Sequence, residues 1–413
     1  MMLTAFLLVL YPMLFLWCIQ HSVYFDKQLP SRKNLSVFFL VRIAVAFFLG
    51  WYSFRYHPGS DYVVLHNESI DSKHALLRDP TGYWRDLFYS PYENAYGGFM
   101  QGVGSFWHDL KYNLLVKGLS LVNLMSNDSY FVNAVLLNMG GFAASCLLYR
   151  VSTHLYPQNK LFNQFACFLL PSTLYYTSGV HKDQLIFIGV GLVVYTGYFS
   201  LHDRIQWRRA MLFLLGLFLL LLFRSYLAIL LIVLFGLYTF HQYRKSRYWT
   251  IGLTLGLVVI GCLFDQWFGY GPMHWIAQRH TEFAALPRAH SQLPTIDLTP
   301  SVIPFIQTAP QAMLHGLCSP PAFMQFRLAD WLFAIEHTSY LLLLVLSAIR
   351  MMSNNRARIP TFSIFLIGLF LALALLSGWI VPNYYSIIRY KSVLLPFLVI
   401  PLWHLSTRKK LSN

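Results

Sequence analysis

An aspartate just beyond an apolar block is the first residue of this sequence that could carry out acid–base chemistry. Asp61 follows residues 57–60, which read His-Pro-Gly-Ser. A carboxylate at the mouth of a cavity can act as a general base when it is partly buried and can reach a hydroxyl group. The alternative is a solvated loop aspartate or a helix N-cap. We take Asp61 as the candidate catalytic base.

A polar turn between two later apolar blocks supplies groups that could bind an anion. Residues 178–183 read Ser-Gly-Val-His-Lys-Asp. Asp183 is placed to cap the helix that follows, and helix N-termini are favourable places for anions. Lys182 and His181 would add hydrogen-bond donors beside a phosphate. The alternative is an ordinary turn with a cap and a lysine that snorkels to the membrane surface.

Two further segments could bring cations to the same membrane face. Arg224 interrupts an apolar stretch, and Arg389 and Lys391 stand at the start of the last apolar block. Arginine suits phosphate because its planar fork can make two parallel hydrogen bonds. Each residue alone could instead be an interfacial, snorkelling cation. Their joint placement favours an anionic lipid headgroup or a leaving phosphate as the ligand.

The segment after Asp61 is rich in acids and histidines. Glu68 and Asp71 are candidate substrate ligands. Together with His66 and His74 they also offer oxygen and nitrogen donors to a divalent cation. This set lacks the tight spacing of a dedicated metal site, and the alternative is a solvated polar helix face. No cofactor is therefore assigned, and a divalent cation stays an alternative.

The composition places these residues in a membrane protein. Of the 413 residues, 56% are hydrophobic and only 11% are charged, whereas an average soluble domain has about 25% charged residues. A soluble enzyme, a disordered tail and a disulfide scaffold are therefore excluded. Several apolar blocks approach the length of about 20 residues that a membrane-spanning helix needs. The eleven candidate spans are residues 3–20, 36–55, 130–149, 161–179, 183–201, 209–223, 226–240, 249–266, 329–350, 360–380 and 390–405.

The basic residues predict an orientation. The stretch 209–240 is too long for one span and short for two, so we interpret it as a tight hairpin at Arg224. A single long tilted helix is the alternative, and it would reverse every later loop. With the hairpin, 17 of the 31 Lys and Arg residues fall in short loops on one side, which the positive-inside rule makes cytoplasmic. The N-terminus is then outside and the C-terminus inside, as expected in a bacterial inner membrane.

Two longer segments, at about 56–128 and 267–327, lie on the outer side in this topology. The first mixes aromatic and charged residues as amphipathic helices at a membrane interface do, and we expect interfacial helices in both loops. No internal repeat or separable soluble region interrupts the chain. The sequence thus predicts an all-α polytopic membrane protein with a single integral membrane domain over residues 1–413.

The layout and several short motifs resemble the bacterial membrane glycosyltransferases of the C-type (GT-C) fold. Within that group the chain is similar to envelope proteins with a Pro-Ser, Ser-Gly and Lys-Asp turn. The motifs are Pro171-Ser172, the turn at 178–183, Tyr130 with Val132 and Asn133, and Arg389-Tyr390-Lys391. The resemblance implies a GT-C-like fold and a polyprenyl-phosphate-linked sugar as donor. It also implies that Asp61 is the general base and that Lys182, Arg224 and Arg389 surround the lipid phosphate.

The predicted function is therefore transfer of a hexose or pentose from a polyprenyl-phosphate donor on the non-cytoplasmic face. The acceptor would be an envelope glycan, lipid or protein. One base and direct attack predict inversion at the anomeric carbon. The alternatives are an envelope polysaccharide polymerase or ligase, and a lipid-linked-glycan flippase or transporter. A transporter needs polar residues along a path through the bilayer, and few stand deep in the spans. The net charge of +15 lies in short loops, so no nucleic-acid partner is implied.

Overall fold

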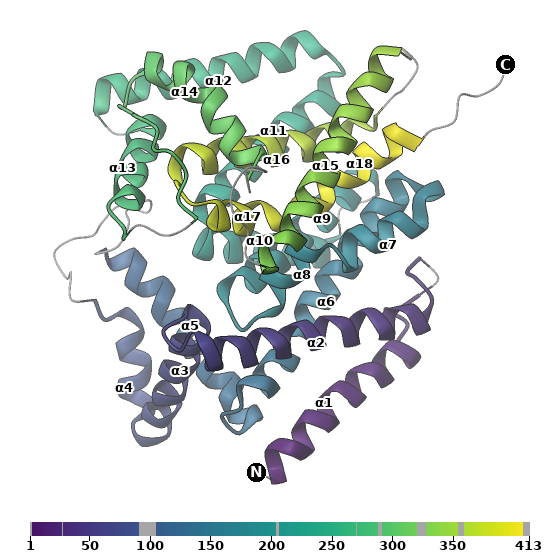
Figure 1. Ribbon diagram of the computed structural model, residues 1–413, viewed down its shortest axis with the longest axis vertical. Helices are drawn as coiled ribbons and strands as arrows, with labels where there is room; N and C mark the ends of the chain where they lie inside the picture. The colour runs from purple at the N-terminus through teal and green to yellow at the C-terminus, as the bar shows by residue number, and fades with distance from the viewer. Residues whose placement is uncertain are drawn as a thin grey trace. The chain divides into compact units, whose positions relative to one another are not determined.

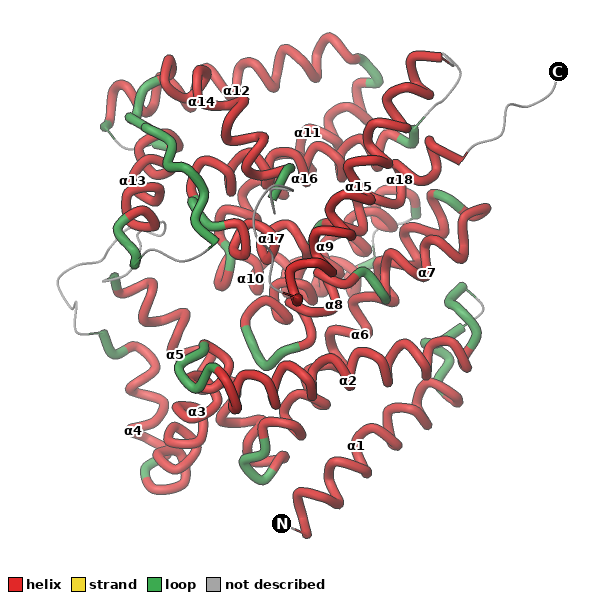
Figure 2. Tube along the Cα trace, in the orientation of Figure 1, coloured by secondary structure: helices red, strands yellow, loops and turns green. Residues whose placement is uncertain are grey.

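The computed structural model describes residues 2–26, 28–90, 105–203, 206–269, 271–287, 291–319, 328–353 and 359–407. Its regular elements are all helices, and these described residues contain no strand beyond one isolated bridge between Gln292 and Asn383 (Figure 2). The predicted all-α class is therefore confirmed for the described residues. Parts of both predicted outer loops, residues 91–104, 270, 288–290 and 320–327, lie outside them.

The chain forms two compact units, Met1–Ser225 and Tyr226–Asn413. Unit 1 contains α1 (Met2–His21), α2 (Arg32–Tyr56), α3 (Asp61–Arg78), α4 (Pro80–Arg85), η1 (Asp86–Phe88), α5 (Phe106–Ser126), α6 (Tyr130–Leu155), η2 (Pro157–Asn159), α7 (Lys160–Phe168), α8 (Pro171–Ser178), α9 (Lys182–His202) and α10 (Trp207–Phe223) (Figure 1). Unit 2 contains nearly all of α11 (Ser225–Arg244), then α12 (Arg247–Phe268), α13 (Pro272–Ala284), α14 (Val302–Leu317), α15 (Leu328–Ser353), α16 (Thr361–Ile380), α17 (Tyr384–Ser392) and α18 (Leu395–Thr407). The predicted single domain stays a prediction.

Eight helices of the described residues are long and apolar enough to cross a membrane, and a ninth span results if the bent pair α17–α18 is counted as one. The eight are α1, α2, α6, α9, α11, most of α12, most of α15, and α16. An integral membrane protein is therefore the class that the fold defines. The predicted count of eleven spans stays a prediction: the block 161–179 forms two short helices, the block 209–223 lies in the 17-residue helix α10, and the block 390–405 falls in a helix pair bent by 74°.

The block 161–179 is broken because of a proline. Helix α7 ends at Phe168, and α8 begins at Pro171. Proline has no N–H to continue a helix and disfavours helical dihedral angles in the residue before it; Leu170 accordingly has φ −58° and ψ 122°. The two short helices still return the chain to the end where α6 began, since the Val180 amide donates to the Tyr130 hydroxyl at 3.4 Å.

The stretch 209–240 consists of two helices, so one continuous helix is excluded. Arg224 separates α10 from α11 with φ −151° and ψ 66°. The predicted break at Arg224 is therefore confirmed. Because α10 belongs to unit 1 and nearly all of α11 to unit 2, the hairpin geometry itself stays a prediction.

Within unit 1, α6 packs against α1, α2 and α9, and α9 packs against α10. The segment after α2 folds as α3 to α5, which pack on one another at one end of these long helices. Buried side chains join α3 and α5 to α2 and α6 there: Ala46, Leu65, Leu115, Val116, Leu119, Tyr130, Ala134 and Val180. The Asn123 amide strengthens this junction by donating to Ser69 at 2.8 Å. This end of unit 1 carries the candidate site.

Unit 2 owes its closest helix contact to small residues. A Cβ atom at Gly378 would lie 1.9 Å from the carbonyl oxygen of Ala312, and one at Gly316 would lie 2.0 Å from that of Ala374. Small residues let helix backbones approach closely in membrane proteins. Helix α14 of the second predicted outer loop therefore packs directly on the apolar helix α16.

Candidate functional site

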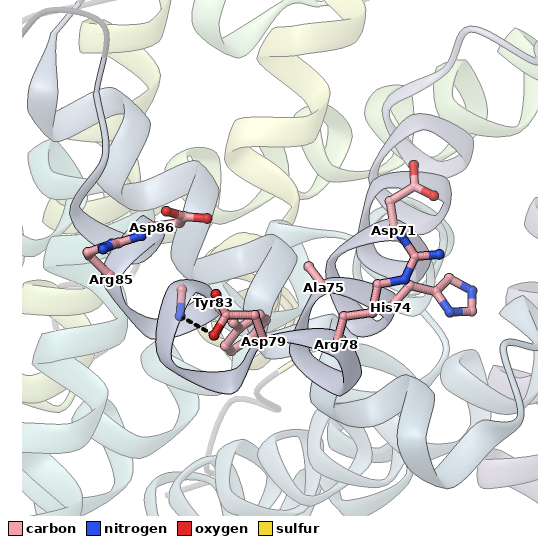
Figure 3. Close-up of a pocket in the computed structure, with 9 residues that line it drawn as sticks. Asp71, His74, Ala75, Arg78, Asp79, Tyr83, Arg85 and Asp86 are labelled. Atoms are coloured by element: carbon pink, nitrogen blue, oxygen red, sulfur yellow. Dashed lines mark hydrogen bonds between the residues drawn. The ribbon is translucent and has the colours of Figure 1, made fainter.

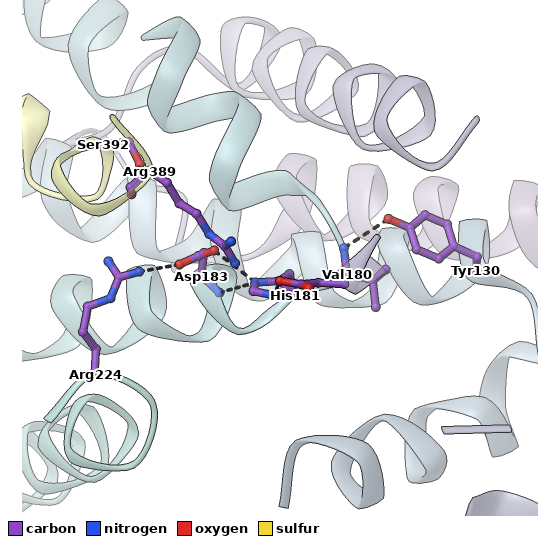
Figure 4. A network of polar contacts seen from close by, with 8 residues as sticks. Tyr130, Val180, His181, Asp183, Arg224, Arg389 and Ser392 are labelled. Carbon is purple, nitrogen blue, oxygen red and sulfur yellow. Dashed lines mark hydrogen bonds and ion pairs between the residues drawn. The ribbon is translucent and has the colours of Figure 1, made fainter. Parts of the chain in front are cut away.

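A chain of four charged or titratable side chains lies where α3, α9 and the end of α10 meet in unit 1. Figure 4 labels three of them, His181, Asp183 and Arg224. Asp61 Oδ2 is 3.3 Å from His181 Nε2, and His181 Nδ1 is 3.0 Å from Asp183 Oδ2. The other oxygen of Asp183 accepts a hydrogen bond from the Arg224 guanidinium at 2.6 Å. The order is therefore carboxylate, imidazole, carboxylate and guanidinium.

Only the first of these four side chains is exposed to solvent. The Asp61 side chain is 66% exposed, that of His181 3%, that of Asp183 0% and that of Arg224 3%. A buried carboxylate is stable as an ion only with a close charged partner and hydrogen bonds, and Arg224 provides that partner. The outer carboxylate is thus accessible to a substrate, while the inner pair is buried and ion-paired.

Local sequence places these groups. Asp61 is the first residue of α3 after the N-cap Ser60, and His181 is the N-cap of α9 with Asp183 in the first turn. Between α8 and α9 the backbone is extended at Gly179, where a Cβ atom would lie 2.3 Å from the Tyr62 ring. Glycine therefore lets Tyr62 approach, and its ring lies 5.4 Å from that of His181.

A buried arginine forms hydrogen bonds that stabilise the turn before His181. Arg42 of α2 donates to the backbone and side chain of Thr177 and, at 2.7 Å, to Asn138. Asn138 in turn donates to the Ser178 carbonyl at 2.7 Å. A cation at a helix C-terminus satisfies carbonyls that lack partners within the helix. Arg42 thus pairs within the helix bundle.

A cavity of about 260 Å³ opens beside Asp61 and His181. It is lined by Asp61, Val64, Leu65, His108, Lys111, Tyr112, Leu115, His181, Lys182 and Phe223. Two lysines therefore share the cavity with the exposed carboxylate. The Tyr112 hydroxyl donates to Glu68 at 2.5 Å, and burial together with this bond raises the pKa of Tyr112.

Three of these lining residues were missed by the sequence reasoning. His108, Lys111 and Tyr112 come from α5, whose sequence predicted only an amphipathic interfacial helix. The spacing of His108 and Lys111, three residues apart, puts both on one helix face. That face could have been noted, but nothing local indicated that it turns toward Asp61.

An apolar groove adjoins the cavity. It has a volume of about 170 Å³ and is lined by Leu114, Leu115, Gly118, Leu119, Val122, Leu137, His181 and Leu185. Leu115 and His181 line both spaces. The cavity with its two lysines therefore continues into a hydrocarbon-lined groove between α5, α6 and α9.

The structure gives separate contacts for the remaining predicted ligands. Arg224 does not line the cavity, because it is buried against Asp183. Lys391 is buried in unit 2, where it donates to the Ser319 carbonyl and the Tyr340 hydroxyl, each at 2.8 Å. Arg389 lies on the same helix, α17. For Arg389 and Lys391, the predicted position beside the lipid phosphate stays a prediction.

The four metal candidates on α3 point to different surroundings. His66 is buried against Phe54 and Tyr130, and burial lowers its pKa. Glu68 faces Tyr112. Asp71 and His74 line an open pocket of about 460 Å³ between the end of α3 and α4, together with Ala75, Arg78, Asp79, Gly82, Tyr83, Arg85 and Asp86 (Figure 3). Across the residues with assigned structure, no three His, Cys, Asp or Glu side chains gather as a metal-binding group.

Comparisons with protein-family models, with curated proteins and with solved structures found no match to this chain. The class stated above, an all-helical integral membrane protein, therefore follows from the fold alone. Its function has to be argued from the cavity and its residues.

Proposed function

We propose that this protein is a membrane glycosyltransferase that moves a sugar from a polyprenyl-phosphate donor to an envelope acceptor. The observation that carries the proposal is the union of three features in unit 1. An accessible carboxylate, Asp61, faces a cavity that also holds Lys111 and Lys182, and this cavity continues into the apolar groove. Such a site suits a substrate with a hydrocarbon chain, an anionic link and a hydroxyl-bearing partner.

The chemistry follows from the charges. Asp61 accepts the proton of the acceptor hydroxyl as its oxygen attacks the anomeric carbon. The departing phosphate gathers negative charge, which Lys182 and Lys111 stabilise. Direct attack with one base gives inversion at that carbon. Glu68 and Tyr112, which lie beside the cavity, would contact the sugar or the acceptor.

The non-cytoplasmic face is supported by the position of the N-terminus and by the charge pattern. Asn127, just before α6, donates to Thr4 at 3.1 Å, so α1 begins at the same end of unit 1 as the site. The short basic loops after α1, α6 and α9 lie at the opposite end, which the positive-inside rule assigns to the cytoplasm. The site would then face the periplasm of a bacterial inner membrane.

Two alternatives use the same ligand chemistry. A polysaccharide polymerase or ligase would differ in the length of the acceptor, and a flippase would move the lipid without breaking a bond. The exposed carboxylate paired with an imidazole favours bond cleavage, because transport of an anion gains nothing from a base.

A transfer assay in proteoliposomes tests the proposal with a panel of polyprenyl-phosphate sugars. We expect Asp61→Asn to lower kcat about 10²–10⁴-fold, the usual effect of losing a general base. Lys182→Ala should lower kcat/KM roughly 10- to 100-fold, the worth of one hydrogen bond to a charged group. Lys160→Ala, an exposed lysine on α7, is the matched control and should change neither. Equal turnover by all four proteins would refute the site, and a labelled lipid that changes leaflets without cleavage would establish the flippase.

A further inference from the structure

We propose that His181 is a second catalytic residue, which takes from Asp61 the proton that Asp61 removes from the acceptor hydroxyl. The inference rests on the proposed function and adds to it a group for which the sequence predicted only phosphate binding. It stands on the contact of Asp61 with His181 and on the contacts of Asp183 with His181 and Arg224, which Figure 4 shows.

The inner half of this chain fixes which nitrogen of His181 carries a proton. Asp183 stays ionised because Arg224 contacts it at 2.6 Å in a fully buried position. An ionised carboxylate 3.0 Å from Nδ1 requires a proton on that nitrogen. The Asp183 amide N–H also points at Nδ1 and would favour an unprotonated Nδ1, but it does so from 3.4 Å, so the closer carboxylate decides. Nε2 is then the nitrogen left to exchange a proton.

The outer half puts Nε2 in contact with the reacting group. Asp61 Oδ2 lies 3.3 Å from Nε2, and His181 lines the cavity itself. The other titratable groups of unit 1 that face this cavity are Lys182 of α9 and His108, Lys111 and Tyr112 of α5. The ring of Tyr62 lies beside that of His181.

These residues account for every proton that moves in the reaction. As the acceptor oxygen bonds to the anomeric carbon, the bond from that carbon to the phosphate oxygen breaks and its electron pair leaves with the phosphate. The acceptor proton moves to Asp61 and then to His181 Nε2. The resulting imidazolium lies between two carboxylates, Asp61 and Asp183, which stabilise it as the aspartate of a Ser-His-Asp triad does. His181 later returns the proton to water through the exposed Asp61.

A double-mutant cycle on turnover tests this shared role. Asp61→Asn and His181→Gln should each lower kcat about 10²-fold or more, and the double variant should be no slower than the worse single one, because groups that act as a unit are not additive. The matched control pairs Asp61→Asn with His108→Gln. His108 lines the same cavity but is not part of the series Asp61, His181, Asp183 and Arg224. We expect those two effects to multiply. Multiplying effects in the Asp61–His181 pair would overturn the inference.

A second measurement needs no turnover. ¹⁵N spectra of histidine-labelled wild-type protein in nanodiscs report which ring nitrogen carries the proton, and His181→Gln identifies the signal among the 15 histidines. We expect a proton on Nδ1 when His181 is neutral. A neutral ring protonated on Nε2 would overturn the inference even if sugar transfer is observed. An inactive protein with the expected spectrum and no donor consumed would count against the proposed function instead.

Discussion

At the scale of single residues, the sequence identified the main charged groups, and the structure adds a side-chain contact for one of them. Asp61, His181 and Lys182 were predicted to meet at one site, and they line one cavity. Arg224 was predicted beside a phosphate; it contacts Asp183, 41 residues away in the chain, and its place beside a phosphate stays a prediction. Residue type alone indicates that a buried arginine needs an anion. It cannot say whether that anion is a ligand or a side chain.

The buried ion pair makes a prediction about stability. Arg224→Gln leaves Asp183 as an uncompensated buried charge, which costs about 3–5 kcal/mol. The double variant Arg224→Gln with Asp183→Asn removes both charges and should recover much of that loss. Thermal unfolding in detergent measures both. Arg208→Gln, at an exposed position on the same helix, is the control, and an Arg224→Gln protein as stable as this control would contradict the ion pair's role.

At the scale of helices, hydropathy located most of the long helices but did not show which apolar blocks are broken into shorter ones. Eight predicted blocks became long apolar helices. The block 161–179 instead forms two short helices divided just before Pro171. We predicted a single span there because the length and hydropathy of an apolar block do not take account of a proline within it. The helices of the 56–128 loop were expected at the interface. Their packing on α2 and α6 depends on buried contacts such as Leu65 and Leu115, which no local pattern specifies.

The groove beside α5 makes a prediction about lipid length. A Cβ atom at Gly118 meets no atom within 4 Å, so Gly118→Phe should fill the groove without disturbing the fold. We expect KM to rise about tenfold or more for a long-chain polyprenyl donor and to stay unchanged for a short-chain, water-soluble analogue. Gly252→Phe on α12, where a Cβ atom also meets open space, controls for added bulk. Equal effects on both donors would show that the groove does not hold the chain.

At the scale of the whole molecule, composition was enough to predict an all-helical membrane protein. Only 11% of the residues are charged, and no other fold class fits that fraction together with such long apolar blocks. The division into two units after Ser225 was not predicted. It depends on which helices pack together, as in the close approach of Gly378 to Ala312, and hydropathy carries no information about helix partners.

The central claim is that unit 1 binds a lipid-linked phosphate with its headgroup beside Asp61 and Lys182 and its chain in the groove. Photo-crosslinking tests this most directly, with a polyprenyl phosphate that carries a diazirine in its first isoprene units. In proteoliposomes we expect cross-links at residues 114–122 of α5 and at Leu185 of α9, and we expect unlabelled polyprenyl phosphate to remove them while excess anionic phospholipid does not. Cross-links confined to unit 2, or equal competition by any anionic lipid, would contradict the account.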